Sequence, residues 1–199
     1  HIFEERYKLM ITRCLEEKRA FGVLLIRTGS EVDGAAVPHE VGTTAEIAGA
    51  KQLDDGRLKI VAVGGERFRL QALKTDQPYL VGDAEAWPIG GSSTERAQQQ
   101  VEPVRNLFRH YLDLVDRTGG NITEIEEIPD EPRALALLVA ITMRVPAPQK
   151  LHLLVQHTVG EVLSAERKLL HREQLILEQI DRTQGEQWEG GYSGFLARN

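Results

Sequence analysis

The sequence predicts an α+β protein in which a β-rich N-terminal part precedes a helical C-terminal part. Two observations predict this class: apolar residues recur at every second position in several segments before Gly90, and at helical spacing after it. We expect a β-rich part with one early helix over residues 1–90, a helical part over 91–182 and a flexible tail over 183–199.

The composition is that of an ordinary folded protein. Hydrophobic residues make up 41% and charged residues 27% of the 199 residues, close to the average for globular domains. The net charge of −6 provides no basic field for phosphate backbones or an anionic membrane, which disfavours nucleic-acid and membrane partners. Cys14 is the single cysteine, so the chain has no internal disulfide, and we expect a cytoplasmic location.

The chain opens with an apolar pair, Ile2 and Phe3, directly before a predicted helix. Residues 4–18 form that amphipathic helix, because apolar side chains recur there at helical spacing. The apolar run 21–26 is too short for a helix and predicts a buried strand. We expect Ile2 and Phe3 to finish a strand and pack under the helix, which implies a preceding strand outside this chain and an unfilled strand position near residue 1.

Alternating residues predict the rest of the sheet. The stretches 41–48 and 58–62 alternate, and Asp54-Asp55-Gly56 between them predicts a hairpin turn because glycine adopts a positive φ readily. Gly64-Gly65 marks either a bulge or a second turn, with a further strand after it. A last strand is expected over 79–87.

The helical half begins at a capping pattern. Ser92 is followed three residues later by Glu95, the spacing of a capping box, and predicts a helix start. Pro103 lacks an amide hydrogen and is expected to kink this helix or divide it into two. Gly119-Gly120 should end it.

Three further helices are predicted after an acidic stretch. Residues 124–131 are interpreted as a solvated loop. Apolar residues lie on all sides of the segment 134–143, so that helix is expected to be central and buried. A short helix should follow over 149–156, and the capping-box spacing over 158–161 starts a longer one.

Motifs for catalysis, cofactors and metals are not found in the sequence. It contains no phosphate-binding P-loop, no G-x-S-x-G elbow and no H-E-x-x-H zinc motif, so we predict no catalytic, cofactor-binding or metal-binding residue. Ser164 and Lys168 have the residue types of a serine–lysine dyad one helical turn apart, and His157 and Glu161 share that spacing. We interpret both as surface pairs, because helices produce such spacings by chance.

Five residues are candidates for a binding surface. Arg67 and Arg69 flank Phe68 on a predicted strand, a combination that could stack on and hold single-stranded nucleic acid. Tyr7 and Tyr79 are further candidates, although all three aromatic residues fall on apolar periodic faces, which favours core packing over a ligand platform.

Four segments, in this order and at this spacing, carry a resemblance to a known family: H-I-F-E-E-R-Y at 1–7, F-G-V-L-L-I-R at 21–27, V-G-T-T-A-E-I at 41–47 and D-G-R-L-K-I-V-A-V-G-G-E-R-F-R-L at 55–70. They resemble the N-terminal, substrate-binding domain of the Lon protease family. The helical half is similar in plan, over residues 135–146 and 163–180. The resemblance covers nearly the whole chain to about residue 182.

The resemblance implies a PUA-like β pseudobarrel followed by an α-helical bundle. It also implies a noncatalytic role, because a separate ATPase and a separate serine–lysine peptidase act in the full proteases and neither motif occurs in this sequence. We therefore expect a module that binds unfolded or exposed hydrophobic protein segments, as an adaptor in proteolysis with a protease as partner. An RNA-binding PUA-like module is the alternative, an unrecognised hydrolase at Ser164 and Lys168 is the third reading, and weak homo-oligomer formation is left open.

Overall fold

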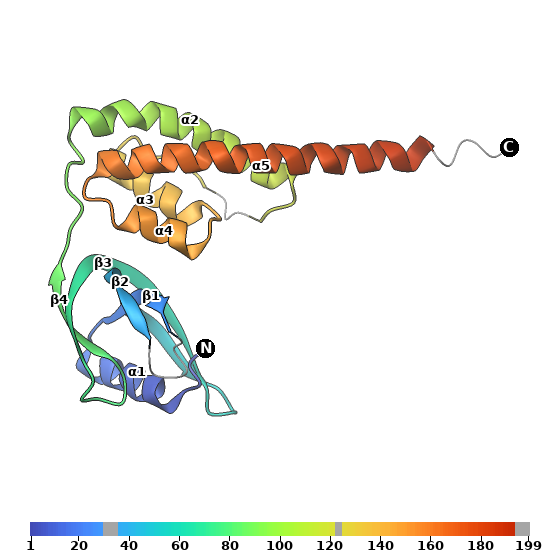
Figure 1. Ribbon diagram of the computed structural model, residues 1–199. Coiled ribbons are helices and arrows are strands. Elements are labelled where there is room, and N and C mark those ends of the chain that lie inside the picture. Colours follow the sequence, from blue (N-terminus) through green and yellow to red (C-terminus); the bar gives the residue numbers. More distant parts are fainter. Residues whose placement is uncertain (30–35, 122–124, 194–199) are drawn as a thin grey trace. The chain divides into compact units, whose positions relative to one another are not determined.

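The protein folds into two compact units, which we call the sheet unit, His1–Ile89, and the helical unit, Gly90–Asn199. The structure, a computed structural model, describes residues 1–29, 36–121 and 125–193, with the backbone alone for residues 184–193. An antiparallel sheet precedes a set of helices, so the predicted α+β class is confirmed (Figure 1). In the described residues, no helix is long and apolar enough to cross a membrane.

The sheet is an antiparallel meander in which each strand pairs with the next along the chain (Figure 1). Its strands are β1 (Phe21–Thr28), β2 (Val37–Gln52), β3 (Leu58–Lys74) and β4 (Val81–Ala86). The predicted turn joins β2 to β3: Gly56 has a φ of 78°, and the amide of Leu53 donates to the carbonyl of Arg57 at 2.8 Å. β1 and β4 are the outer strands in this order.

β3 is one long strand, which corrects the expectation of a second turn and a further strand after Gly64-Gly65. Gly64-Gly65 marks a bulge, the other feature predicted for this position. Thr43 pairs with Arg67 and Ala45 pairs with Gly64, so two residues of β2 are matched by three of β3. A Cβ on Gly65 would lie 2.5 Å from Oγ1 of Thr44, which explains the need for glycine at this close approach.

The early helix is α1 (Glu5–Glu17), and its Ile11 is fully buried. Ahead of it, Ile2 forms an isolated antiparallel bridge with Leu58 at the start of β3. Phe3 is 66% exposed, so the expectation that it packs under the helix is wrong. Neighbouring side chains on an extended backbone point to opposite sides, so the bridge that turns Ile2 inward turns Phe3 outward.

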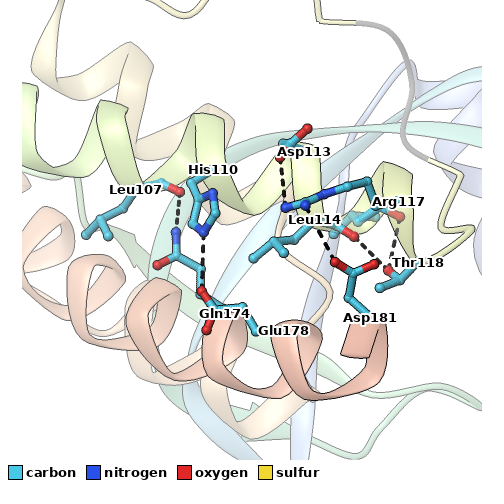
Figure 2. Close-up of polar contacts among 10 residues, drawn as sticks. Leu107, His110, Asp113, Leu114, Arg117, Thr118, Gln174, Glu178 and Asp181 are labelled. Atoms are coloured by element: carbon cyan, nitrogen blue, oxygen red, sulfur yellow. Dashed lines mark hydrogen bonds and ion pairs between the residues drawn. The ribbon is translucent and has the colours of Figure 1, made fainter. Parts of the chain in front are cut away.

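The helical unit contains α2 (Glu95–Arg117), α3 (Pro132–Thr142), α4 (Ala147–Leu154) and α5 (Val159–Ser193). Within this unit, α5 lies along α2 and also contacts α3 and α4 (Figure 1). Figure 2 shows how α2 and α5 are joined: Nε2 of the buried Gln174 donates to the carbonyl of Leu107 at 2.7 Å. Farther along the same interface, Arg117 pairs with Asp113 of α2 and Asp181 of α5.

The helix starts follow capping rules, with one correction. Thr94, not Ser92, caps α2, because Oγ1 of Thr94 accepts the amide of Ala97. Thr158 and Glu161 form the predicted capping box reciprocally: each side chain accepts the amide of the other residue, at 3.3 and 3.0 Å.

Part of the acidic stretch has a structural role that the loop interpretation missed. Glu131 caps α3, since its carboxylate accepts the amides of Arg133 and Ala134 at 3.0 and 2.6 Å. Asp130 pairs with Arg105 of α2. Glu124 lies outside the described residues.

The structure limits two predictions about the interiors of helices. Of the two alternatives for Pro103, division is excluded, because α2 is one helix through the proline, with Val101 and Val104 on either side of it buried. α3 is not buried on all sides: Leu137 is 52% and Ile141 is 78% exposed. The helix buries Leu135, Ala136 and Val139, while Leu137 and Ile141 lie on its exposed side.

α5 extends well beyond the predicted end of the helical part at residue 182. It is helical to Ser193, so helix replaces much of the tail predicted over 183–199. Residues 194–199 lie outside the described residues.

Candidate functional site

Arg67 and Arg69 lie on one face of β3 and share one aromatic partner, Trp87. Their guanidinium carbons lie 4.7 and 4.6 Å from the centre of the Trp87 ring, within the range of cation–π attraction. The amide of Trp87 donates to the carbonyl of Arg67 at 3.0 Å and fixes the ring beside the strand. The arrangement places two positive charges on one indole and forms a preorganised cationic face.

Phe68 lies on the opposite face of β3, as strand alternation requires. Its ring is 8% exposed and packs over two glycines: a Cβ on either Gly22 or Gly42 would lie 3.0 Å from the Cζ atom of Phe68. The ring is therefore part of the core and offers no open surface on which a base could stack. This position does not favour the RNA-binding alternative, which needed Phe68 beside the arginines.

Tyr79 is buried and contacts α1. Tyr79 is 8% exposed, and its hydroxyl accepts a hydrogen bond from Nη1 of Arg13 at 3.4 Å. Hydrogen bonds to Glu17 and then Tyr79 raise the pKa of Arg13, so this cation stays charged. Tyr7 is half-buried and lies 4.6 Å from the guanidinium of Arg6. The structure therefore brings Arg67 and Arg69 together on Trp87 and buries Phe68 and Tyr79.

The sequence pattern did not indicate that Trp87 lies over the two arginines. The available signal was weak: two arginines at i and i+2 on a strand, and an aromatic residue at the far end of the neighbouring hairpin strand.

The far half of the β2–β3 hairpin exposes a second feature, which we call the valine strip: Val61 and Val63 of β3. These side chains are 59% and 58% exposed and lie on the same face of the strand. Val61 pairs with Gly49 of β2, which has no side chain to cover it. Adjacent exposed aliphatic side chains are typical of surfaces that bind apolar partners.

Lys59 continues the valine strip at its N-terminal end. It pairs directly with Lys51 of β2, and both are exposed. Like charges opposite one another repel, so an acidic group bound beside them would be favoured. The strip is therefore apolar with a positive end.

The helical pairs singled out in the sequence serve the helix itself. Oγ of Ser164 donates to the carbonyl of Gly160 at 2.6 Å, as helical serines often do. Glu161 accepts the amides of Thr158 and His157, and these bonds, the one from Thr158 first, lower the pKa of its carboxyl. Among the described residues, no three His, Cys, Asp or Glu side chains are grouped to hold a metal ion.

The family model of the ATP-dependent protease La (LON) substrate-binding domain matches residues 1–172. The chain belongs to this family. Related Lon proteases include Lon protease 2 of Myxococcus xanthus, 26% identical over 172 residues, and the Lon protease of Anaeromyxobacter dehalogenans strain 2CP-C, 26% identical over 171. These alignments cover 85% of this chain but only 21% and 20% of the relatives, so the chain spans about a fifth of their length.

Solved structures of Lon N-terminal domains share the fold. The Lon N-terminal domain protein from Xanthomonas campestris has a TM-score of 0.59 at 23% identity and matches 82% of this chain and 83% of that one. The N-terminal domain of the Lon protease of Mycobacterium avium complex has a TM-score of 0.60 at 15% identity, with 87% of each chain covered. At these identities the likeness shows the fold alone.

Proposed function

We propose that this Lon substrate-binding domain is a noncatalytic module that binds unfolded or exposed hydrophobic segments of proteins and presents them for proteolysis. The observation that carries the proposal is the family match over residues 1–172. The valine strip supports it, because a binder of unfolded chains needs accessible apolar surface.

Unfolded proteins differ from folded ones in two physical respects that such a module can detect. They expose apolar side chains, and their backbone amides and carbonyls are not committed to secondary structure. Val61 and Val63 offer apolar contact to the exposed apolar side chains. The outer strands β1 and β4 are places where an extended, uncommitted backbone could pair. A folded protein exposes much less of both features, so the module discriminates by how much is exposed.

The polar side chains that resembled catalytic groups stabilise helix structure, which agrees with a binding role. Ser164 and Glu161, the residues that most resembled catalytic groups, hold the first turns of α5 together. We propose that hydrolysis and ATP use belong to a Lon-type protease with which the module associates, and that the module contributes recognition as an adaptor.

The test compares one polypeptide in two states. A small disulfide-bonded protein, labelled with a fluorophore, is titrated with this chain in its native form and after reduction and carboxymethylation, and anisotropy reports binding. We expect the unfolded form to bind at least about tenfold more tightly, which is a difference of about 1.4 kcal/mol in binding free energy. Equal affinity for both forms, or no binding of the unfolded form, would contradict the proposal.

The adaptor role has its own test. The unfolded polypeptide is degraded by a Lon-type protease with and without added chain, and fragments are quantified over time. We expect degradation to accelerate when this chain is present at a lower concentration than the polypeptide. Steady slowing in proportion to the added chain would mean that the module only sequesters the polypeptide.

A further inference from the structure

A pocket of about 260 Å³ lies between α2 and α5, within the helical unit, and we call it the α2–α5 pocket. Each helix lines it with three residues at the spacing i, i+4 and i+7, which lie on one helical face. These are Tyr111, Val115 and Thr118 of α2, and Glu173, Leu177 and Ile180 of α5. Gly120 and Arg144 also line the pocket.

The size of the pocket and its aliphatic side chains limit what it can hold. Pockets that enclose a drug-sized ligand have volumes of about 300–1,000 Å³, so this one suits a smaller molecule. Val115 is buried and Ile180 is 41% exposed, so the aliphatic lining extends from the interior to the surface. A fitting ligand therefore has a short aliphatic part.

Tyr111 and Arg144 supply hydrogen-bond donors to the pocket. The backbone amide of Arg144 donates to the hydroxyl oxygen of Tyr111 at 3.0 Å, so this hydroxyl keeps its own hydrogen to donate. The Arg144 guanidinium donates to the carbonyl of Asn121 and, among the residues that the structure describes, has no acidic partner. A guanidinium carries five N–H donors, so others remain for a ligand. The two side chains together suit a carboxylate.

Gly120 allows the Arg144 guanidinium to lie close to the end of α2. A Cβ on Gly120 would lie 3.3 Å from Nη1 of Arg144 and 2.4 Å from Cγ1 of Val115. The carbonyl end of a helix carries a partial negative charge, which attracts a cation. Arg144 thus also stabilises the helix end, and a test of binding has to separate that role from recognition of a ligand.

α5 supplies a carboxylate to the same pocket. The side chain of Glu173 is 16% exposed, and its Oε1 atom pairs with Arg172 at 2.6 Å. In the described part of the chain, Oε2 of Glu173 has no partner, and Glu173 does not pair with Arg144. The pocket therefore contains two opposite charges that do not neutralise each other. A ligand with an ammonium for Glu173 and a carboxylate for Arg144 would complement both.

We propose that the α2–α5 pocket binds a free aliphatic α-amino acid such as leucine. The carboxylate of the amino acid contacts Arg144 and the Tyr111 hydroxyl, and its ammonium contacts Glu173. Its side chain packs on Leu177 beside the other aliphatic residues of the lining. A free amino acid carries both charges and a short aliphatic group in one small molecule. The site goes beyond the proposed function and does not rest on it.

NMR titration of the unaltered chain with L-leucine tests the site. The amide signals of Val115, Gly120 and Leu177 should shift in a saturable way, because these residues line the pocket. Absence of saturable shifts at these residues up to about 10 mM leucine would overturn the proposal.

Two analogues of leucine each lack one charge. Leucinamide has no carboxylate and N-acetyl-leucine has no ammonium, and we expect each to bind at least about tenfold more weakly than leucine. If N-acetyl-leucine binds as tightly as leucine, the pocket takes the C-terminal residue of a polypeptide. If leucinamide does so, it takes an N-terminal residue. Either result would overturn the proposal.

Two variants assign the charges. Arg144→Gln should weaken leucine binding at least about tenfold and remove the preference for leucine over leucinamide. Glu173→Gln should likewise remove the preference for leucine over N-acetyl-leucine. A purely structural role of either side chain would instead weaken leucine and both analogues alike, and that result would contradict the assignment.

Arg133→Gln is the matched control. Arg133 is exposed on α3 and does not line the pocket, so its replacement should change leucine binding less than about twofold. Circular dichroism checks that each variant folds. An equal loss of leucine binding in Arg133→Gln and Arg144→Gln would mean that overall charge, and not the pocket, determines binding.

Discussion

At the residue scale, Glu166 is the charged side chain least matched to its surroundings. It is 0% exposed on α5, and among the described residues neither carboxylate oxygen has a hydrogen-bond partner. Burial raises the pKa of Glu166 well above its ordinary value of 4.5, while the positive charge of Lys150 acts in the opposite direction. Lys150 donates to the carbonyls of Ala140 and Ile141, at the end of α3.

This burial predicts that stability falls as the pH rises. Because the pKa of Glu166 is higher in the folded than in the unfolded state, the folded state binds more protons above pH 4.5, and the free energy of unfolding decreases with pH up to the folded pKa. Glu166→Gln should remove this part of the pH dependence and stabilise the protein at pH 8 relative to the unaltered chain.

Thermal unfolding at several pH values between 5 and 9 measures the effect. Glu127→Gln is the control, because Glu127 is exposed. A Glu166→Gln profile parallel to that of the unaltered chain would show that the carboxylate is ionised and solvated in the folded state.

Also at this scale, alternation alone placed Phe68 and the two arginines on opposite faces of one strand, as the structure has them. It could not place Trp87, because the partner of a strand residue depends on the register of another strand. The burial of Glu166 escaped prediction for a similar reason: helical spacing does not say which charged side chain a neighbouring helix will cover.

At the element scale, the α2–α5 interface depends on Gln174 more than on its ion pairs. Gln174 is 6% exposed and bonds the carbonyl of Leu107, whereas His110 and Glu178 meet at 3.4 Å on an exposed surface (Figure 2). Gln174→Ala should lower the free energy of unfolding by about 1–3 kcal/mol, since it removes a hydrogen bond between the helices and the packing of a buried side chain. His110→Ala should cost less than about 1 kcal/mol. Urea denaturation of both variants checks the order, and equal losses would refute it.

Two glycines of the sheet allow a similar prediction about stability. A Cβ on Gly42 would lie 2.3 Å from the carbonyl oxygen of Val23 and 3.0 Å from Cζ of Phe68, so Gly42→Ala should destabilise the protein by about 1–3 kcal/mol. Gly49→Ala meets nothing within 4 Å and should stay within about 0.5 kcal/mol. Chemical denaturation followed by circular dichroism distinguishes them, and a harmless Gly42→Ala would mean that the strands can separate to admit the methyl group.

Elements were predicted well where one physical rule decided them. The capping box at Thr158 and the hairpin turn at Gly56 are local, and both form as the sequence indicates. Whether Pro103 divides the helix depends on tertiary packing instead: Val101 and Val104 beside it are buried, and the helix is continuous. Local propensity also did not predict that α5 continues to Ser193. An established helix adds residues without a new nucleation cost, so it can extend into a segment that would not start a helix.

At the scale of the whole molecule, the order of period-two and helical segments was enough to predict the α+β class. The quoted segments predicted the family, and the match over residues 1–172 confirms it. The PUA-like pseudobarrel stays a prediction.

The central claim is that this domain recognises unfolded protein segments through its sheet unit. Photo-crosslinking tests it most directly: the reduced, carboxymethylated polypeptide carries a benzophenone label, and mass spectrometry maps the residues of this chain that it captures. The account predicts crosslinks within residues 1–89, concentrated on β3 near Val61, and few with the native polypeptide. Crosslinks confined to the helical unit, or equal capture by native and unfolded polypeptide, would contradict it.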